Sequence, residues 1–436
     1  MTKKFFIQTW GCQMNDHDGE KLTGLMLRDG YEEVRSSKEA DIVLLNTCSI
    51  REKAVHKVFS ELGRLKKEKL QRPLTIGVTG CLAQQEQAHL FTRAPQIDFV
   101  LGTMALGKLP EVLAQAQIDG ERGIDVGEYP DNHLFPTEMA KRKLTAKALV
   151  TIIEGCNHAC TYCIVPRTRG IERSRPFQSI VDEVKRLVDE GYCEIELLGQ
   201  NVNSFQGGCN FTELLQKVSA VNGLEWLRFT TSHPMNFTKE LACEIVSNPK
   251  IAPFLHLPVQ SGSNAVLKRM LREYTIEEYL ERLAYLGSGR SSLCLSTDFI
   301  VGFPGESEAD FQKTLELLDQ VQFETSFSFI YSLRPGTAAV RLKDDLPAEV
   351  KQERLMRLQS RQAHWTLLDN QNMIGKTVDA RIENPILNDE GFWIARTGSS
   401  KTLHLQGKVG RRPQMGQLIS ARIQGASPHF LAAELV

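Results

Sequence analysis

Residues 147–163 read KALVTIIEGCNHACTYC, an apolar run followed by three closely spaced cysteines. The run at 148–153 predicts a β-strand, and the loop after it has the spacing Cys156-x3-Cys160-x2-Cys163. Three thiolates on one loop can hold three irons of a cubane cluster and leave the fourth iron without a protein ligand. The alternative is a zinc site with His158 as the fourth ligand, although this spacing is unusual for zinc.

The alternation of strands and helices continues beyond that loop. Further strand candidates lie at 194–198, 226–230, 254–257, 293–301 and 325–331. Helical patterns lie at 180–189, 211–221, 276–286 and 308–321. Six β/α units in roughly 180 residues indicate a partial (β/α)6 barrel, because a full barrel has eight strands and about 250 residues. With one long helix predicted at 349–373, this domain is expected to span 146–373.

The regions on either side of the barrel have different patterns. Residues 1–118 alternate strand candidates at 5–9, 42–46, 74–79 and 97–101 with helical patterns at 20–28, 52–69 and 83–90. This order is typical of an α/β domain with a parallel sheet. Residues 119–145 contain Gly, Pro and Asn and are expected to be a linker. Residues 374–436 show five short β-like runs and no helical pattern, which predicts a small all-β barrel of the oligonucleotide-binding sort.

Three more cysteines follow strand candidates of the N-terminal domain. Cys12, Cys48 and Cys81 close the runs FIQTWGC, IVLLNTC and LTIGVTGC. Because the carboxyl ends of parallel strands share one edge of a sheet, we expect these three thiols to converge. They are predicted to bind a second cluster, again with one open iron. For Cys193, Cys243 and Cys294 we expect core packing, whereas Cys209 lies in a loop and has no assigned role.

Charge is balanced overall but uneven along the chain. The 436 residues include 52 basic and 53 acidic side chains, which excludes a protein that binds nucleic acid by bulk charge. Residues 141–175 carry eight basic and two acidic side chains, a local charge of +6. In an extended segment Arg167, Arg169 and Arg173 would share one face, and we expect them to contact RNA phosphates. No signal peptide or membrane span is evident, which indicates a cytoplasmic protein.

The cysteine motif resembles a known superfamily. The form C-x3-C-x-aromatic-C, with Tyr162 as the aromatic residue, is similar to the radical S-adenosylmethionine enzymes over roughly residues 147–330. Two three-cysteine sites, an α/β domain before the radical domain and a C-terminal β-barrel together resemble the methylthiotransferases, whose last module is the RNA-binding TRAM domain. The phrases GCQMN, NTCSIRE, CIVPRTRGIERSR, LLGQNVNSF, HLPVQSGS and STDFIVGFPGE are similar to the branch that modifies N6-isopentenyladenosine beside the tRNA anticodon.

This resemblance implies an enzyme that adds a methylthio group to C2 of N6-isopentenyladenosine at position 37 of tRNA. Two S-adenosylmethionine molecules are implied, one as methyl donor and one as source of the 5′-deoxyadenosyl radical. Two [4Fe-4S] clusters are implied, one on the catalytic Cys156, Cys160 and Cys163 and one on the N-terminal cysteines. The implied partners are the tRNA anticodon loop and an electron donor such as a flavodoxin or ferredoxin, while the sulfur source is not indicated.

Cofactor contacts outside the cysteine loops are implied at Tyr162, Gln200, Ser261 and Glu306. Gln200 stands where many superfamily members carry Gly-Gly-Glu, and Glu306 lies one place later than the superfamily pattern has it. Two alternatives keep the chemistry and change the target, to threonylcarbamoyl-adenosine in tRNA or to an aspartate of a ribosomal protein. A third is an iron–sulfur RNA-binding protein without catalysis, which would have no use for an open iron.

Overall fold

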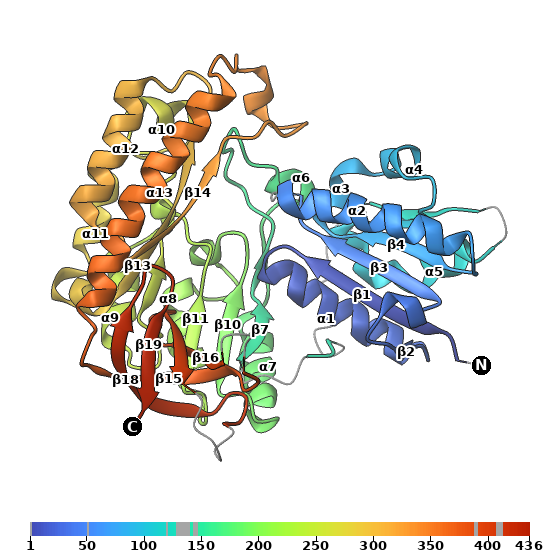
Figure 1. The fold of residues 1–436 in the computed structure, drawn as a ribbon, viewed down its shortest axis with the longest axis horizontal. Coiled ribbons are helices and arrows are strands. Elements are labelled where there is room, and N and C mark those ends of the chain that lie inside the picture. The colour runs from blue at the N-terminus through green and yellow to red at the C-terminus, as the bar shows by residue number, and fades with distance from the viewer. Residues whose placement is uncertain are drawn as a thin grey trace.

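Three bodies make up the chain in the computed structural model (Figure 1). The structure describes residues 2–49, 52–118, 121–127, 140–142, 147–387, 391–406 and 413–436. A parallel sheet with helices forms the N-terminal body, a curved set of β/α units the central one, and a closed β-barrel the C-terminal one. Within the described residues, no helix is both long and apolar enough to cross a membrane.

The N-terminal sheet has six parallel strands in the order β2-β1-β3-β4-β5-β6. The strands are β1 (Lys4–Trp10), β2 (Glu32–Glu33), β3 (Ile42–Thr47), β4 (Thr75–Thr79), β5 (Phe99–Leu101) and β6 (Gly123–Asp125). The four strands expected from the sequence are present. The linker prediction for 119–145 is wrong in part, because β6 lies in that range and pairs with β5. With β6 included, the N-terminal unit extends at least to Asp125.

Helices cover both faces of this sheet. They are α1 (Gln13–Arg28), α2 (Glu52–Lys69), α3 (Cys81–Glu86), α4 (His89–Arg93) and α5 (Leu109–Ala116). Apolar side chains of α1 and α5 pack on one face, and those of α2, α3 and α4 pack on the other. The single helix expected at 83–90 is two short helices, because Gln87 between them has a φ of 51° and ends α3.

Six parallel strands form the central domain, in chain order across two three-stranded sheets. They are β7 (Lys147–Thr151), β10 (Glu194–Leu198), β11 (Trp226–Phe229), β12 (Phe254–His256), β13 (Cys294–Val301) and β14 (Thr325–Ile330). A parallel bridge between Leu227 and Ile251 connects the two sheets. The partial (β/α)6 barrel is therefore confirmed, with β7 and β14 as its open edges.

The helices of the central domain lie outside the strands and share the largest hydrophobic core with them. They are α7 (Phe177–Asp189), α8 (Phe211–Ser219), α9 (Lys239–Ser247), α10 (Asn264–Met270), α11 (Ile276–Ala284), α12 (Glu308–Val321) and α13 (Ala348–Gln371). The inward strand face lines the lumen of the partial barrel, and it carries many polar and charged residues. Lys147, Glu196 and Asp298 are examples.

The C-terminal body is a closed barrel in the order β15-β16-β17-β19-β18. Its strands are β15 (Thr377–Asn384), β16 (Phe392–Thr397), β17 (Thr402–Gln406), β18 (Leu418–Ala426) and β19 (Leu431–Leu435). Inward side chains such as Trp393, Leu405 and Ile423 fill its core. The five-stranded barrel predicted from the sequence is confirmed.

Buried ion pairs fix this barrel against the amino ends of β10 and β11. Glu194, the first residue of β10, bonds Arg228 at 2.6 Å and lies 3.7 Å from Arg381 of β15. Arg228 also donates to the carbonyls of Thr397 and Gly398, and the guanidinium groups of Arg228 and Arg381 both lie over the Trp226 ring. The barrel therefore lies at the edge opposite the strand ends that carry the cysteine loops (Figure 1).

Candidate active site

The N-terminal cysteines meet at the carboxyl edge of the first sheet, as expected. Cys12 is the residue before α1, Cys48 directly follows β3, and Cys81 begins α3. A hydrogen bond from Cys48, the charge of Arg169 and nearby backbone N–H groups outweigh burial and lower the pKa of the Cys12 thiol to about 6. Burial raises the pKa of Cys81, although Arg169 lies against it and acts in the opposite direction.

The second set of cysteines lies on the loop between β8 (Ile153–Glu154) and β9 (Arg173–Ser174), which pair antiparallel and close that loop. The charge of Cys160 raises the pKa of both Cys156 and Cys163, which shows that the three thiols lie close together. Burial raises the pKa of Cys163 to about 12. A buried group of thiols is costly to ionise without a cation, and an iron cluster supplies that cation.

Arg272 is a site residue that the sequence analysis missed. Its Nη1 lies 3.5 Å from both the Cys160 Sγ and the Tyr162 hydroxyl, while Nη2 donates to the carbonyl of Pro258 at 2.9 Å. The residue is only 4% exposed, and among the described residues no carboxylate lies within 4.0 Å of it. A buried guanidinium needs an anionic partner. Thiolates that ligate a cluster would provide one, so the residues present fit the group.

The zinc alternative fits less well. His158 stacks on His233 with 3.8 Å between ring centroids, and its Nε2 lies 3.2 Å from Asn236 Oδ1. Its Nδ1 lies 3.5 Å from a carboxylate oxygen of Glu273, so both ring nitrogens face other partners. In the described part of the chain, no three His, Cys, Asp or Glu side chains surround one point as a single ion requires.

Tyr162 and Gln200 both lie at the cysteine loop. Tyr162 packs against the same apolar cluster as Ile300, and burial holds the pKa of its hydroxyl well above the usual value. Gln200 accepts the N–H of Gly155 through its side-chain carbonyl at 2.5 Å. Gly155 has a φ of +78°, and a Cβ there would lie 2.1 Å from the Ile171 carbonyl. In this structure, Gln200 therefore fixes the start of the cysteine loop.

Ser261 and Glu306 are held inside the protein. Ser261 is fully buried, and its hydroxyl accepts the Ser263 N–H at 3.2 Å. Glu306 accepts the Gly302 N–H at 2.8 Å and pairs with Arg354 of α13 at 2.7 Å. Burial raises the pKa of Glu306 in spite of that arginine. These bonds explain both residues as supports of the strand-to-helix turns after β12 and β13.

The three arginines after the cysteines do not share a face. Residues 165–169 form a short helix, α6 (Val165–Arg169), so the extended segment predicted for Arg167 and Arg169 is wrong. Two positions apart on a helix point to opposite sides. Arg167 is exposed, whereas Arg169 is buried and bonds Asp18 at 2.6 Å. Arg173 is half-buried in β9. Arg169 thus has a carboxylate partner in place of the expected phosphate.

Helix α6 connects the two cysteine sets. Its Arg169 reaches both Asp18 of α1 and the Cys81 thiol, and the Thr103 hydroxyl bonds the Thr168 carbonyl. Lys21, also buried, lies 3.8 Å from Asp18 and 3.5 Å from Glu154. Two positive and two negative groups therefore form one network between the N-terminal and central bodies, in which Asp18, Lys21 and Arg169 are buried and Glu154 is partly exposed. The loop of one cysteine set is tied directly to the edge that carries the other.

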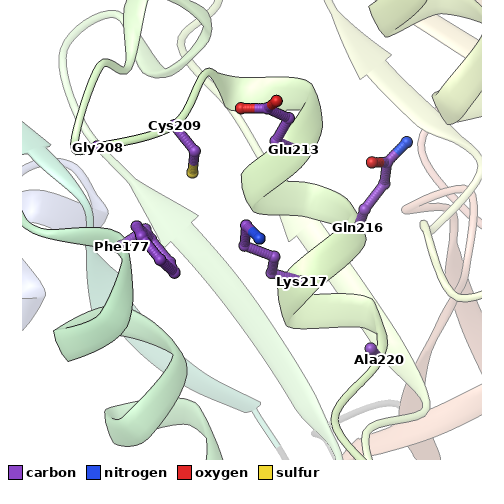
Figure 2. A pocket seen from close by; sticks show the side chains of 7 residues that line it. All are labelled: Phe177, Gly208, Cys209, Glu213, Gln216, Lys217 and Ala220. Carbon is purple, nitrogen blue, oxygen red and sulfur yellow. The ribbon is translucent and has the colours of Figure 1, made fainter.

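Figure 2 shows a pocket away from these cysteines, on the outer surface between α7 and α8. Lys217 lies over the Phe177 ring at 5.0 Å, and Cys209 borders the same hollow. Cys209 is half-buried, as its loop position allows. Cys294 is buried and Cys193 half-buried, but the core packing expected for Cys243 is wrong because that thiol is exposed.

Three sequence families match this chain in the order of its three bodies. Residues 4–102 match the uncharacterized protein family UPF0004, residues 150–318 match the Radical SAM superfamily, and residues 371–436 match the TRAM domain. The fold resembles solved radical S-adenosylmethionine enzymes. The methyltransferase TsrM from Kitasatospora setae aligns with a TM-score of 0.57 and 13% identity, covering 78% of this chain and 77% of that one. OxsB aligns with a TM-score of 0.54 and 14% identity, covering 83% and 56%.

Fold and cysteine loops together define a radical S-adenosylmethionine enzyme with an added N-terminal sheet and a C-terminal TRAM barrel. Full-length relatives are more specific. The tRNA-2-methylthio-N(6)-dimethylallyladenosine synthase of Solibacter usitatus is 42% identical over 439 residues, covering 99% of this chain and 98% of that one. The enzyme of that name from Burkholderia thailandensis is 42% identical over 447 residues, covering 100% and 98%. The chain belongs to this family of tRNA methylthiotransferases.

Proposed function

We propose that this chain adds a methylthio group to C2 of N6-dimethylallyladenosine (N6-isopentenyladenosine) at position 37 of tRNA. The observation that carries the proposal is the pair of three-cysteine sites, each at the carboxyl edge of its own sheet and both tied to α6. The full-length relatives bear the name of this reaction. A reaction that needs both a radical source and a sulfur carrier explains why two sites are kept together.

Each site is proposed to hold one [4Fe-4S] cluster through its three cysteines. When bound, the central cluster supplies an open iron for S-adenosylmethionine and the electron that cleaves its C–S bond to a 5′-deoxyadenosyl radical. Cys156, Cys160 and Cys163 provide its thiolates, and Arg272 balances their charge. Cys12, Cys48 and Cys81 would provide the thiolates that hold the N-terminal cluster, and that cluster would carry the sulfur that is to receive a methyl group from S-adenosylmethionine.

The remaining residues position the cofactor or the loop that holds it. Tyr162 packs against the apolar cluster that Ile300 also joins, and we assign its ring as an apolar surface for the cofactor. Gln200 holds Gly155, and Ser261 and Glu306 hold the turns below, so we assign these three to support of the site. Water exclusion at the site protects the radical, and the apolar side chains around Tyr162 contribute to it.

For the tRNA we assign contacts to Arg167 and Arg173, which follow the three cysteines, and to the TRAM barrel. Arg169 is excluded by its burial and by its bond to Asp18. A one-electron donor such as a flavodoxin or ferredoxin is required, and a cytoplasmic location fits a tRNA substrate. The source of the inserted sulfur is a separate supply that the chain's own residues do not identify.

The test separates the two sites by iron content and product. In anaerobically reconstituted protein, replacing Cys156, Cys160 and Cys163 with Ala should leave about half the iron and abolish 5′-deoxyadenosine formation. Replacing Cys12, Cys48 and Cys81 should also leave about half the iron, spare radical formation and abolish methylthiolation of tRNA nucleosides measured by mass spectrometry. A matched control replaces Cys193, Cys209 and Cys243 and should change neither readout. Full iron in the Cys12 set variant would refute the second site.

A further inference from the structure

Two phenylalanines on the last strand of the partial barrel are unusually exposed. Phe327 and Phe329 of β14 have 53% and 45% of their surface accessible. Their neighbour Ile330 packs into the core shared with the outer helices. Because side chains alternate along a strand, the two phenylalanines face the opposite side, which is the lumen. Edge strands usually carry charged residues, so adjacent exposed aromatic rings indicate a surface that something covers.

This surface begins directly below the cysteine loop. Phe329 is the cross-strand neighbour of Ile300, and Ile300 packs in the same apolar cluster as Tyr162. One step further down, Phe327 meets the His256 ring edge-on, with 5.9 Å between centroids. The two rings therefore line the lumen from the cysteine loop toward the middle of the barrel, where a base brought to the radical must lie.

The carboxylate of Asp298 stands beside the apolar surface. Asp298 is the register partner of Phe327, so its carboxylate lies on the same face of the sheet. One carboxylate oxygen is 3.4 Å from His256 Nε2, and the side chain keeps 26% of its surface accessible. An apolar wall with one adjacent acceptor matches a secondary amine whose substituent is a branched hydrocarbon. The N6 group of dimethylallyladenosine has that form, with one N–H and a five-carbon apolar chain.

We propose that Phe327 and Phe329 form the wall of a subsite for the branched apolar substituent of the target base, with Asp298 accepting the N6 hydrogen. The inference rests on the proposed function and adds to it the residues that recognise the modified base. Burial of the hydrocarbon against both rings favours the prenylated base over plain adenine, because the plain base leaves the wall in water.

The experiment compares RNA affinities and so does not depend on turnover. Two anticodon stem-loop RNAs, one with N6-dimethylallyladenosine and one with adenosine at the target position, are titrated against the reconstituted holoenzyme. The wild type should bind the prenylated RNA roughly tenfold or more tightly. In Phe327→Ala/Phe329→Ala most of that preference should vanish, with unchanged affinity for the adenosine RNA. Phe329→Leu should retain most of it, and Met356→Ala, at an exposed apolar position on α13, serves as the control.

The possible results distinguish the apolar wall from a cofactor contact and from the proposed function. Equal binding of both RNAs by the wild type would overturn the proposed wall, as would equal losses for both RNAs in the double variant. Loss of RNA-free 5′-deoxyadenosine formation in the double variant would instead assign the rings to the cofactor. If the wild type prefers the prenylated RNA but yields no methylthiolated nucleoside, the subsite stands and the proposed function fails.

Discussion

The buried pair Asp18–Arg169 offers the sharpest test of how the two bodies are held together. Its atoms lie 2.6 Å apart, and the side chains are 0% and 5% exposed. Together with Lys21 and Glu154 the network is electrically balanced. Asp18→Asn removes the carboxylate that Lys21 and Arg169 share, and leaves these two buried cations with only the partly exposed Glu154. Removing one partner of such a pair costs about 3–5 kcal/mol.

That loss of stability should make local opening of α1 and α6 more frequent. A loss of about 3 kcal/mol raises the opening equilibrium roughly a hundredfold. Hydrogen exchange followed by mass spectrometry should therefore show faster exchange in peptides from α1 and α6. The double variant Asp18→Asn/Arg169→Gln restores the balance of Lys21 with Glu154. Its loss in the free energy of local opening should be about 1–3 kcal/mol smaller than the sum of the losses in Asp18→Asn and Arg169→Gln alone.

An exposed pair provides the comparison. Arg186 of α7 and Glu190, the residue that follows this helix, lie 2.7 Å apart but are 40% and 47% exposed. Glu190→Gln should therefore change the free energy of local opening by well under 1 kcal/mol. If Asp18→Asn behaves like that control, the buried pair does not hold the two bodies together. If the double variant shows the full sum of both single effects, the two charges do not interact.

Three further outcomes follow from the contacts. Arg272→Met should keep its iron but lower the reduction potential of the central cluster by about 59 mV, which is tenfold for one electron, because a positive charge beside Cys160 is lost. Arg272→Lys should show a smaller shift. An EPR-monitored redox titration that shows no shift would contradict the electrostatic role of Arg272. Glu194→Gln removes the carboxylate shared by two arginines and should speed protease cleavage near residues 372–376 while leaving RNA-free cofactor cleavage intact. Arg167→Ala should weaken tRNA binding and reduce its log–log salt slope by about 0.7, with iron content unchanged.

Much of the fold could be predicted because parallel β/α units leave a strong pattern. The buried runs of β3, β10 and β13 stand out from the amphipathic helices, and strand ends share one edge, so the meeting of Cys12, Cys48 and Cys81 followed from topology alone. β2 (EE) and β6 (GID) were missed because neither carries an apolar run like those that identified the equally short β5 and β12.

The rest depends on contacts between distant residues. Arg169 finds Asp18 across 151 positions, and Arg272 finds Cys160 across 112, and nothing local in either stretch indicates its partner. Arg167 and Arg169 were expected on one face because side chains two positions apart point the same way in an extended segment. Pro166 in the first turn of α6 was the signal that favoured a helix.

The position of the TRAM barrel sets a length requirement on any RNA that it binds together with the cysteine edge. The barrel contacts the first residues of β10 and β11, while the cysteine loops follow the last residues of the strands. The five residues of β10 alone extend about 17 Å. An RNA that contacts both the barrel and the cysteine edge must reach at least that far. The docked barrel therefore sets a minimum length for such an RNA. A free nucleoside or a very short oligonucleotide contacts only the barrel or only the cysteine edge. It therefore lacks the additional affinity that a folded tRNA arm gains from binding at both places.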